Sequence, residues 1–196
     1  MKPEVSTQDI VIGAVVLVIV LICAYWVGGL LSRWKNARFA RAWAPLVPVI
    51  NGTITNDGGG AATSWLTGMY AGHQVRASIT PDRNRYSEQT GPRYNYFDVA
   101  LLDVQGRQDW SIRSKNIVAD DVLEERLRES GIVAMLTSIG SPEARYNARQ
   151  QTLQISLEVT SGWAPMPESF QAYLNLLLRL SEINAAVNHS DLSTSK

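Results

Sequence analysis

The chain has few of the residues that build disulfides and metal sites. It contains one cysteine, Cys23, and two histidines, His73 and His189. A single cysteine excludes an intrachain disulfide and any zinc site built from several thiolates. A lone thiol also fits a reducing compartment such as the cytoplasm. We therefore expect the chain to bind no metal and no cofactor.

The chain also lacks net charge, but its cations are unevenly placed. Lysine plus arginine and aspartate plus glutamate each number 18. From residue 57 onward, 16 acidic residues outnumber 13 basic ones. A nucleic-acid-binding domain is expected to be strongly basic. The mildly acidic balance therefore argues against nucleic acid as a partner.

No charged side chain occurs between residues 10 and 32, IVIGAVVLVIVLICAYWVGGLLS. A helix of ~20 apolar residues, rising ~1.5 Å per residue, crosses the ~30 Å hydrocarbon core of a bilayer. The alternative is a cleaved signal peptide, but that would have a basic start and an apolar core of only ~7–15 residues. We therefore expect residues 10–32 to form an uncleaved transmembrane helix, preceded by a short tail of residues 1–9.

Basic residues flank this segment mainly on its C-terminal side. Only Lys2 precedes it, whereas four cations and no acid follow directly: Arg33, Lys35, Arg38 and Arg41. Such cations stay on the cytoplasmic side, where each gains ~1 kcal/mol near anionic lipid. The bias predicts a single-pass cell-membrane protein with its N-terminus outside and its C-terminal domain in the cytoplasm. The inverted orientation is the alternative, because the rule is statistical.

Aromatic residues gather around the C-terminal end of the predicted helix and in a juxtamembrane segment, residues 33–45. Indole and phenol rings prefer the headgroup layer, so Trp34, Phe39 and Trp43 are expected to dip into it while the arginines point outward. Pro45 should then end the helix. The alternative is an ordinary helix end with snorkelling cations. The predicted membrane-interface residues are Tyr25, Trp26, Arg33, Trp34, Lys35, Arg38, Phe39, Arg41 and Trp43.

Two small residues of the apolar segment, Ala24 and Gly28, lie four positions apart. Small residues at this spacing let two membrane helices approach closely. Glycine is also simply frequent in membrane helices, which is the alternative explanation. The spacing favours a helix-packing surface for a membrane-protein partner.

Residues 46–188 have the size of one domain, and residues 189–196 read as a disordered polar tail. Hairpin patterns alternate with helical ones, which predicts an α+β domain of antiparallel β-hairpins packed with two helical segments. Gln105-Gly106-Arg107 is expected to turn one strand directly into the next. The predicted strands are 46–55, 65–70, 74–80, 94–104 and 109–113, in a sheet of four or five strands, followed by a second hairpin of 144–148 and 152–159.

Residues typical of helix ends predict where the two helical segments begin and end. Asp120 and Asp121 favour a helix N-terminus, and Gly131 should end or kink that helix. Pro167 suits the first turn of a long second helix whose apolar residues recur every three or four positions.

One polar loop combines cations with tyrosines. It carries the candidate docking residues Arg83, Arg85, Tyr86 and Arg93. Interleaved cations and aromatic rings can contact headgroups, protein or phosphate. The alternative is an ordinary solvated hairpin loop.

The sequence contains only weak candidates for catalytic or metal-binding residues. The cluster of Asp120, Asp121, Glu124 and Glu125 is explained by a helix N-terminus rather than by metal binding. His73 stands at a turn with no nucleophile in a recognisable motif. Asp98, Asp103 and Asp109 could supply a pair of carboxylates for general acid–base catalysis. However, Asp98 and Asp103 are an odd number of residues apart, which places them on opposite faces of a strand. No catalytic residue is therefore assigned.

The sequence thus favours a non-catalytic accessory or scaffold protein, a subunit or assembly factor of a membrane complex, whose partners are the bilayer and other membrane helices. The alternative is a membrane-tethered enzyme or ligand-binding domain. A third interpretation is lipid sensing by the juxtamembrane segment.

Overall fold

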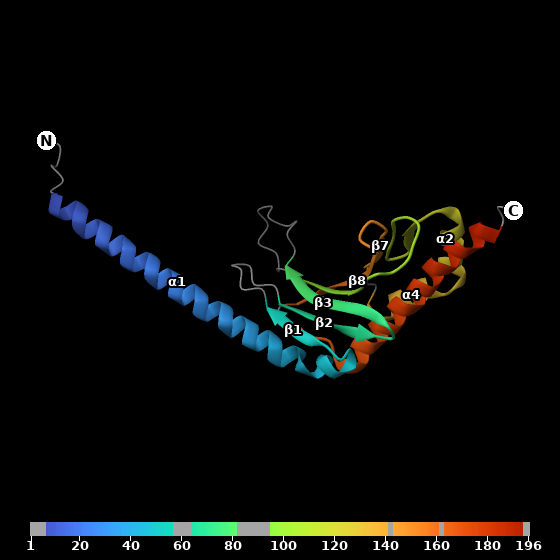
Figure 1. The fold of residues 1–196 in the computed structure, drawn as a ribbon, viewed down its shortest axis with the longest axis horizontal. Coiled ribbons are helices and arrows are strands. Elements are labelled where there is room, and N and C mark those ends of the chain that lie inside the picture. The colour runs from blue at the N-terminus through green and yellow to red at the C-terminus, as the bar shows by residue number, and fades with distance from the viewer. Residues whose placement is uncertain (1–6, 57–63, 82–94, 141–142, 161–162, 194–196) are drawn as a thin grey trace.

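The structure, a computed structural model, describes residues 7–56, 64–81, 95–140, 143–160 and 163–193. A long N-terminal helix joins an α+β domain, as the sequence predicts (Figure 1). The helices are α1 (Thr7–Trp43), the 3₁₀ helix η1 (Ala44–Val49), α2 (Asp121–Glu129), α3 (Ile132–Ser138) and α4 (Pro167–Ser193). The strands are β1 (Thr53–Asn56), β2 (Ser64–Tyr70), β3 (His73–Pro81), β4 (Asn95–Leu101), β5 (Trp110–Arg113), β6 (Asn116–Val118), β7 (Glu143–Asn147) and β8 (Thr152–Val159).

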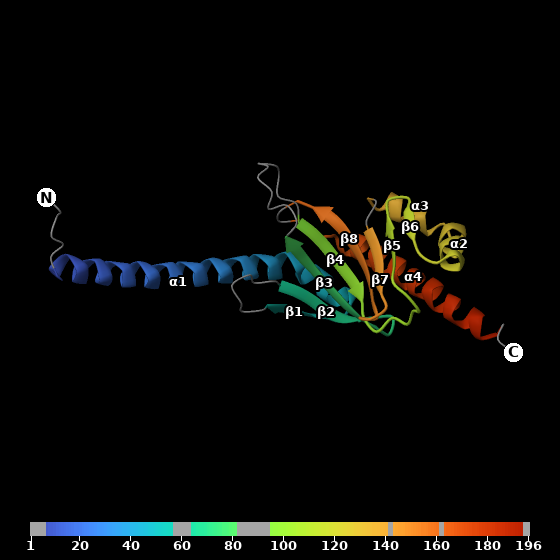
Figure 2. The ribbon, with the colours of Figure 1, turned by 90° about the horizontal axis from the view of Figure 1, so that it is seen from above.

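Helix α1 extends away from the domain for most of its 37 residues (Figure 2). Its apolar part is long and apolar enough to cross a membrane, and none of that part is buried in the protein. The helix continues without a break through the juxtamembrane residues to Trp43. The chain then changes to the 3₁₀ helix η1, with proline in its first turn, as expected from the missing amide N–H of Pro45.

Within the described residues, eight strands form one antiparallel sheet in the order β1-β2-β3-β4-β8-β7-β5-β6. This order corrects the prediction of two separate blocks of strands. β4 does not turn directly into β5, because β3 and β8 occupy its two edges. β5 instead pairs with β7 and with the short strand β6, which was not predicted from the sequence.

The insertion of β8 beside β4 has a clear physical basis. Seven residue pairs join the two strands, from Leu101↔Leu153 to Asn95↔Val159. Four alternating side chains of β8 point into the core: Leu153, Ile155, Leu157 and Val159. A long strand with one fully apolar face is stabilised most at the centre of a sheet, where that face meets the packed helices.

The predictions for the β2–β3 hairpin and for the strand at residues 46–55 have different outcomes. The β2–β3 hairpin is confirmed, with Ala71 and Gly72 both at positive φ in a two-residue loop. The predicted strand 46–55 is shorter than expected, since only Thr53–Asn56 pairs, at the sheet edge. Leu46 and Ile50, which precede it, are fully buried residues of the core.

The helix signals are largely confirmed. Asp120 caps α2, because its Oδ1 accepts the Leu123 amide at 2.8 Å. Gly131, at φ +70°, separates α2 from α3. α4 begins at Pro167 but runs to Ser193, so the start of the predicted disordered tail is helical. No proline or glycine interrupts that stretch, so the backbone ladder continues past the apolar stripe.

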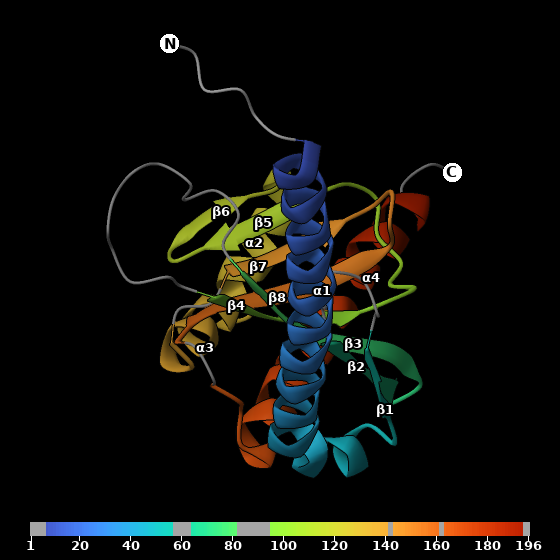
Figure 3. The same cartoon turned by 90° about the vertical axis from the view of Figure 1, so that its left-hand side faces the viewer.

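In the part of the chain that the structure describes, the helices cover one face of the sheet and leave the other open. α4 crosses beneath the sheet, with α2 and α3 beside it, and the core lies between (Figures 1 and 2). The uncovered face, here called the open face, carries alternate polar side chains such as Arg76, Arg145 and Gln154. Figure 1 shows this face on the same side of the domain as the N-terminal part of α1, and Figure 3 shows α1 standing in front of the sheet.

Candidate functional site

The last turns of α1 have two different faces. One face packs against the domain through Asn36, Phe39 and Trp43. The Asn36 Oδ1 accepts a hydrogen bond from the Ser64 hydroxyl at 3.3 Å, which ties α1 to the first residue of β2. Trp43 is only 1% exposed. This face therefore belongs to the domain.

The other face carries charge and remains exposed. Trp34 is 61% exposed, and Arg38 and Arg41, four and seven positions further on, are exposed on the same side of the helix. The Arg38 guanidinium carbon lies 5.8 Å from the centroid of the Trp34 ring, in cation–π range. We call Trp34, Arg38 and Arg41 the cationic face.

This division corrects the expected arrangement of the juxtamembrane aromatics. Trp34 and Trp43 are nine residues apart, or two and a half turns, so they point in opposite directions. Trp43 and the half-buried Phe39 cannot dip into headgroups, because they pack in the domain. Trp34 shares its side with Arg38 and Arg41 instead of opposing them. Helical spacing alone could have separated the two sets.

Trp43 joins an aromatic cluster that fixes α1 to the core. Its ring stacks on Phe39 at 4.4 Å and meets Phe97 of β4 at 5.7 Å. Phe97 in turn contacts rings of the segment before α4 and of α4 itself: Trp163, Phe170 and Tyr173. Burial raises the pKa of the Tyr173 phenol above its usual value near 10. The orientation of α1 is thus coupled to that of the sheet.

The remaining predicted membrane residues lie on the projecting part of α1. Tyr25 is 84% exposed and Trp26 is 69% exposed, and Arg33 is also exposed. Lys35 belongs to the same continuous helix. These positions fit an interface role, which stays a prediction.

The predicted packing pair also lies on exposed helix surface. A Cβ atom built on Gly28 would meet no atom within 4 Å, and Ala24 is exposed one turn earlier. The surface is therefore accessible to a neighbouring helix. Its use as a packing site stays a prediction.

The candidate docking residues Arg83, Arg85, Tyr86 and Arg93 lie outside the described residues. The strands that flank them, β3 and β4, end and begin at Pro81 and Asn95, which pair with each other.

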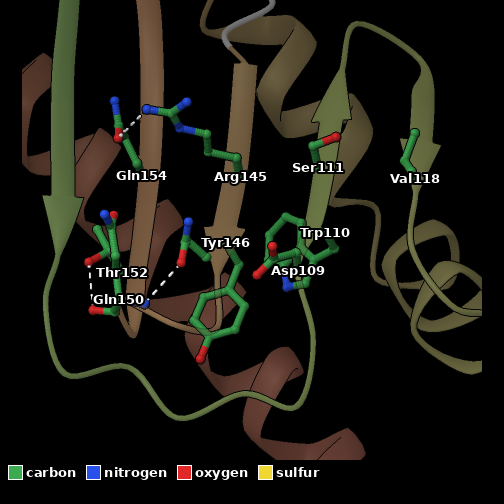
Figure 4. Close-up of a pocket in the computed structure, with 10 residues that line it drawn as sticks. Asp109, Trp110, Ser111, Val118, Arg145, Tyr146, Gln150, Thr152 and Gln154 are labelled. Carbon is green, nitrogen blue, oxygen red and sulfur yellow. Dashed lines mark hydrogen bonds between the residues drawn. The ribbon is translucent and has the colours of Figure 1, made fainter.

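A cleft on the open face is a second candidate site, which the sequence did not reveal. It has a volume of about 500 Å³ and lies over β5, β7 and the start of β8 (Figure 4). Polar side chains dominate its lining, which includes Asp109, Ser111, Arg145, Gln150 and Gln154. These residues come from strands far apart in the sequence, so no local motif marks them.

Hydrogen bonds hold several of the lining side chains in place. Arg145 donates from Nη2 to the Gln154 Oε1 at 3.0 Å, and the Asp109 Oδ1 accepts the Ala148 amide at 2.7 Å. The exposed Arg145 retains further N–H groups that can reach an anionic ligand. The cleft is thus suited to a small polar molecule.

The floor of this cleft rests on a buried polar network. The Tyr146 hydroxyl donates to the Val104 carbonyl at 2.9 Å, and Trp110 donates from Nε1 to the Asn184 Oδ1 at 2.9 Å. Asn184 donates onward to the Gln105 carbonyl at 2.9 Å. Burial raises the pKa of Tyr146; a hydrogen bond with Asn184 partly opposes this, and the nearby Asp109 adds to it. The phenol therefore stays neutral and serves as a donor.

Two of the other acidic residues considered for catalysis or metal binding, Asp98 and Glu124, have side-chain partners on their own strand pair or helix. Asp98 accepts hydrogen bonds from the Ser156 hydroxyl at 2.6 Å and from the Gln154 amide at 2.7 Å, so it belongs to a side-chain network across β4 and β8. Glu124 pairs with Arg128 at 2.7 Å on α2. Within the described part of the chain, no three His, Cys, Asp or Glu side chains converge as a metal site.

Comparisons with protein-family models, curated proteins and solved structures find no match for this chain. Its function therefore rests on the geometry of α1 and of the open face.

Proposed function

We propose that this chain is a single-pass, membrane-anchored, non-catalytic accessory or scaffold protein, a subunit or assembly factor of a membrane complex. One observation carries the proposal. Every side chain of α1 from residue 12 to residue 31 is exposed, while the last residue of the same helix, Trp43, is buried in the domain core.

The exposed apolar helix needs an apolar environment. Soluble monomers rarely expose contiguous apolar patches larger than a few hundred Å². Each Å² of apolar surface removed from water stabilises by ~25 cal/mol, so a helix of this composition partitions strongly into a bilayer. The helix then enters the domain without a flexible linker. A rigid connection of this kind holds the open face at a set orientation to α1, which suits a scaffold.

The proposed orientation places the N-terminus outside the cell and the domain in the cytoplasm. Its support is the group of cations that follows the apolar segment: Arg33, Lys35, Arg38 and Arg41. A reporter fused after Lys196 should be active if it requires the cytoplasm and inactive if it requires export. Replacing the four cations with glutamine should give mixed orientations.

The matched control replaces four cations within the domain: Arg113, Lys115, Arg126 and Arg128. This variant should keep the original orientation, because charges far from the apolar segment contribute little to it. Full activity of the exported reporter in the unmodified chain would show that the proposed orientation is wrong.

The proposed partner is a membrane protein that contacts α1 through Ala24 and Gly28. Gly28→Leu should weaken co-purification of the partner in mild detergent, because a bulky side chain separates the two helices. Gly29→Leu is the control, since Gly29 points about 100° away around the helix. Equal recovery of partner with all three forms would contradict this use of the helix.

The cleft on the open face favours one other function, a membrane-tethered ligand-binding domain. Its volume of about 500 Å³ lies within the ~300–1,000 Å³ typical of small-molecule sites. Small carboxylates and phosphates should then raise the thermal unfolding temperature, and Arg145→Gln should remove that effect. Such a result would favour ligand binding over a purely structural role.

A further inference from the structure

We infer that the cationic face of α1, formed by Trp34, Arg38 and Arg41, is a binding surface for anionic lipid headgroups. The inference rests on the proposed function, because it requires α1 to leave a bilayer just before this face.

The position of the face along α1 matches the depth of the headgroups. At ~1.5 Å per residue, Trp34 lies ~3 Å and Arg38 ~9 Å beyond Ser32, the last residue of the uncharged segment. The headgroup layer adds ~5–8 Å on each side of the hydrocarbon core. The Trp34 ring therefore lies within that layer, and the long Arg38 side chain reaches back toward it over the ring.

Arg41 lies farther from the hydrocarbon core than Trp34 and Arg38 do. It lies ~13 Å beyond Ser32 along an upright helix. A tilt of ~20°, which is average for membrane helices, brings it closer when α1 leans toward this face. The ~8 Å screening length at physiological salt then permits attraction to the anionic surface.

The chemistry of the three side chains suits phosphate. Each guanidinium presents a planar fork of N–H donors that matches phosphate oxygens. The Trp34 indole has the apolar body and polar tip that favour the interface. The Arg38 guanidinium lies over this ring, so Trp34 helps to position Arg38. Net negative lipid charge attracts each cation, which distinguishes anionic from zwitterionic lipid.

The fold keeps this face accessible. The domain packs on the opposite side of α1 through Asn36, Phe39 and Trp43. Because these contacts fix α1 to the sheet, a lean toward the cationic face moves the domain on the other side away from the bilayer. Lipid charge would thus set how far the open face stands from the membrane.

The experiment uses the full chain in lipid nanodiscs. Cys23→Ser removes the native thiol, and Ala37→Cys, at an exposed position beside the cationic face, carries a fluorophore that shifts to the blue in a less polar environment. Phosphatidylglycerol is titrated into phosphatidylcholine. We expect a blue shift that grows with phosphatidylglycerol content and fades at high salt.

Two double variants complete the test. Arg38→Gln/Arg41→Gln should reduce the blue shift at a given phosphatidylglycerol content by roughly fivefold or more, because ~1 kcal/mol for each arginine corresponds to about fivefold in affinity. Arg113→Gln/Arg126→Gln, which removes two exposed domain cations, should leave the titration unchanged. The inference would be overturned if the emission maximum did not change with phosphatidylglycerol content, or if it shifted equally in all variants.

Resistance of the chain to alkaline carbonate extraction separates this result from the proposed function. A chain that resists extraction but shows no response to phosphatidylglycerol contradicts the lipid-binding face and leaves the anchor intact. A chain released by carbonate contradicts the anchor itself.

Discussion

The ring of Trp43 meets the ring of Phe97 with centroids 5.7 Å apart and planes inclined by 63°. This contact joins the last residue of α1 to the central part of β4. It makes the C-terminal end of α1 part of the domain core rather than a linker between anchor and domain.

Trp43→Ala should destabilise the domain strongly. Truncating a fully buried tryptophan removes its apolar contacts and leaves a cavity, at a cost of about 3–5 kcal/mol. The free energy of unfolding is to be measured by urea denaturation of the full chain in detergent, followed by tryptophan fluorescence. Trp34→Ala is the matched control and should change it by less than ~0.5 kcal/mol, because that ring is exposed. Similar effects of the two changes would contradict the assignment of Trp43 to the core.

The boundary of an independently folding fragment follows from the same contact. The sequence pattern places the domain start at Leu46, but a fragment from Leu46 lacks Trp43 and Phe39. A fragment from Arg33 retains both, together with the Asn36–Ser64 hydrogen bond. We expect the Arg33 fragment to unfold cooperatively and the Leu46 fragment to unfold at lower urea or to aggregate. Equal midpoints would show that the end of α1 is dispensable.

Asn184→Ala should disrupt the buried network beneath the cleft. It leaves the Trp110 Nε1 and the Gln105 carbonyl without their partner, at about 1–3 kcal/mol for each unsatisfied group. The change is to be measured by thermal or urea unfolding. Asn175→Ala on the same helix is the control. It removes an exposed hydrogen bond to Tyr70 and should cost about 1 kcal/mol or less.

Stability should fall above about pH 10. Burial raises the pKa of Tyr146 and of Tyr173 in the folded state, so the unfolded chain loses these protons first as the pH rises. The stability they contribute is fully present below pH 10 and is lost as the pH approaches their folded values. Urea midpoints measured between pH 7 and pH 11 should show this decline.

Two tyrosine variants separate the pH effect from packing. Tyr173→Phe should flatten the alkaline decline with little change at pH 7. Tyr146→Phe should also flatten it but should cost about 1 kcal/mol at pH 7, because the Val104 carbonyl loses its donor. An unchanged alkaline decline in both variants would contradict the role of these phenols.

The elements that the sequence predicted are those fixed by local chemistry. The uncharged run of α1, the Asp120 cap, the break at Gly131 and the start of α4 at Pro167 each depend on a few neighbouring residues. The β2–β3 hairpin depends on the positive-φ turn at Ala71 and Gly72.

Gly106 shows why other parts could not be predicted. In the sequence it resembles the centre of a tight turn. In the structure, a Cβ atom there would collide with Asn184 of α4 and with the Tyr146 ring of β7, so close packing explains the glycine. Both partners are distant in sequence, and no local pattern marks the contact.

The apolar helix, the α+β composition and the positions of the main caps and turns follow from the sequence alone, because these features depend on composition and short-range periodicity. Three features arise only in the folded chain: β8 separates β4 from β5, polar residues of several strands line one cleft, and Trp43 faces the core while Trp34 faces outward. Those outcomes follow from long-range competition for strand edges and for buried apolar volume, which only the folded chain resolves.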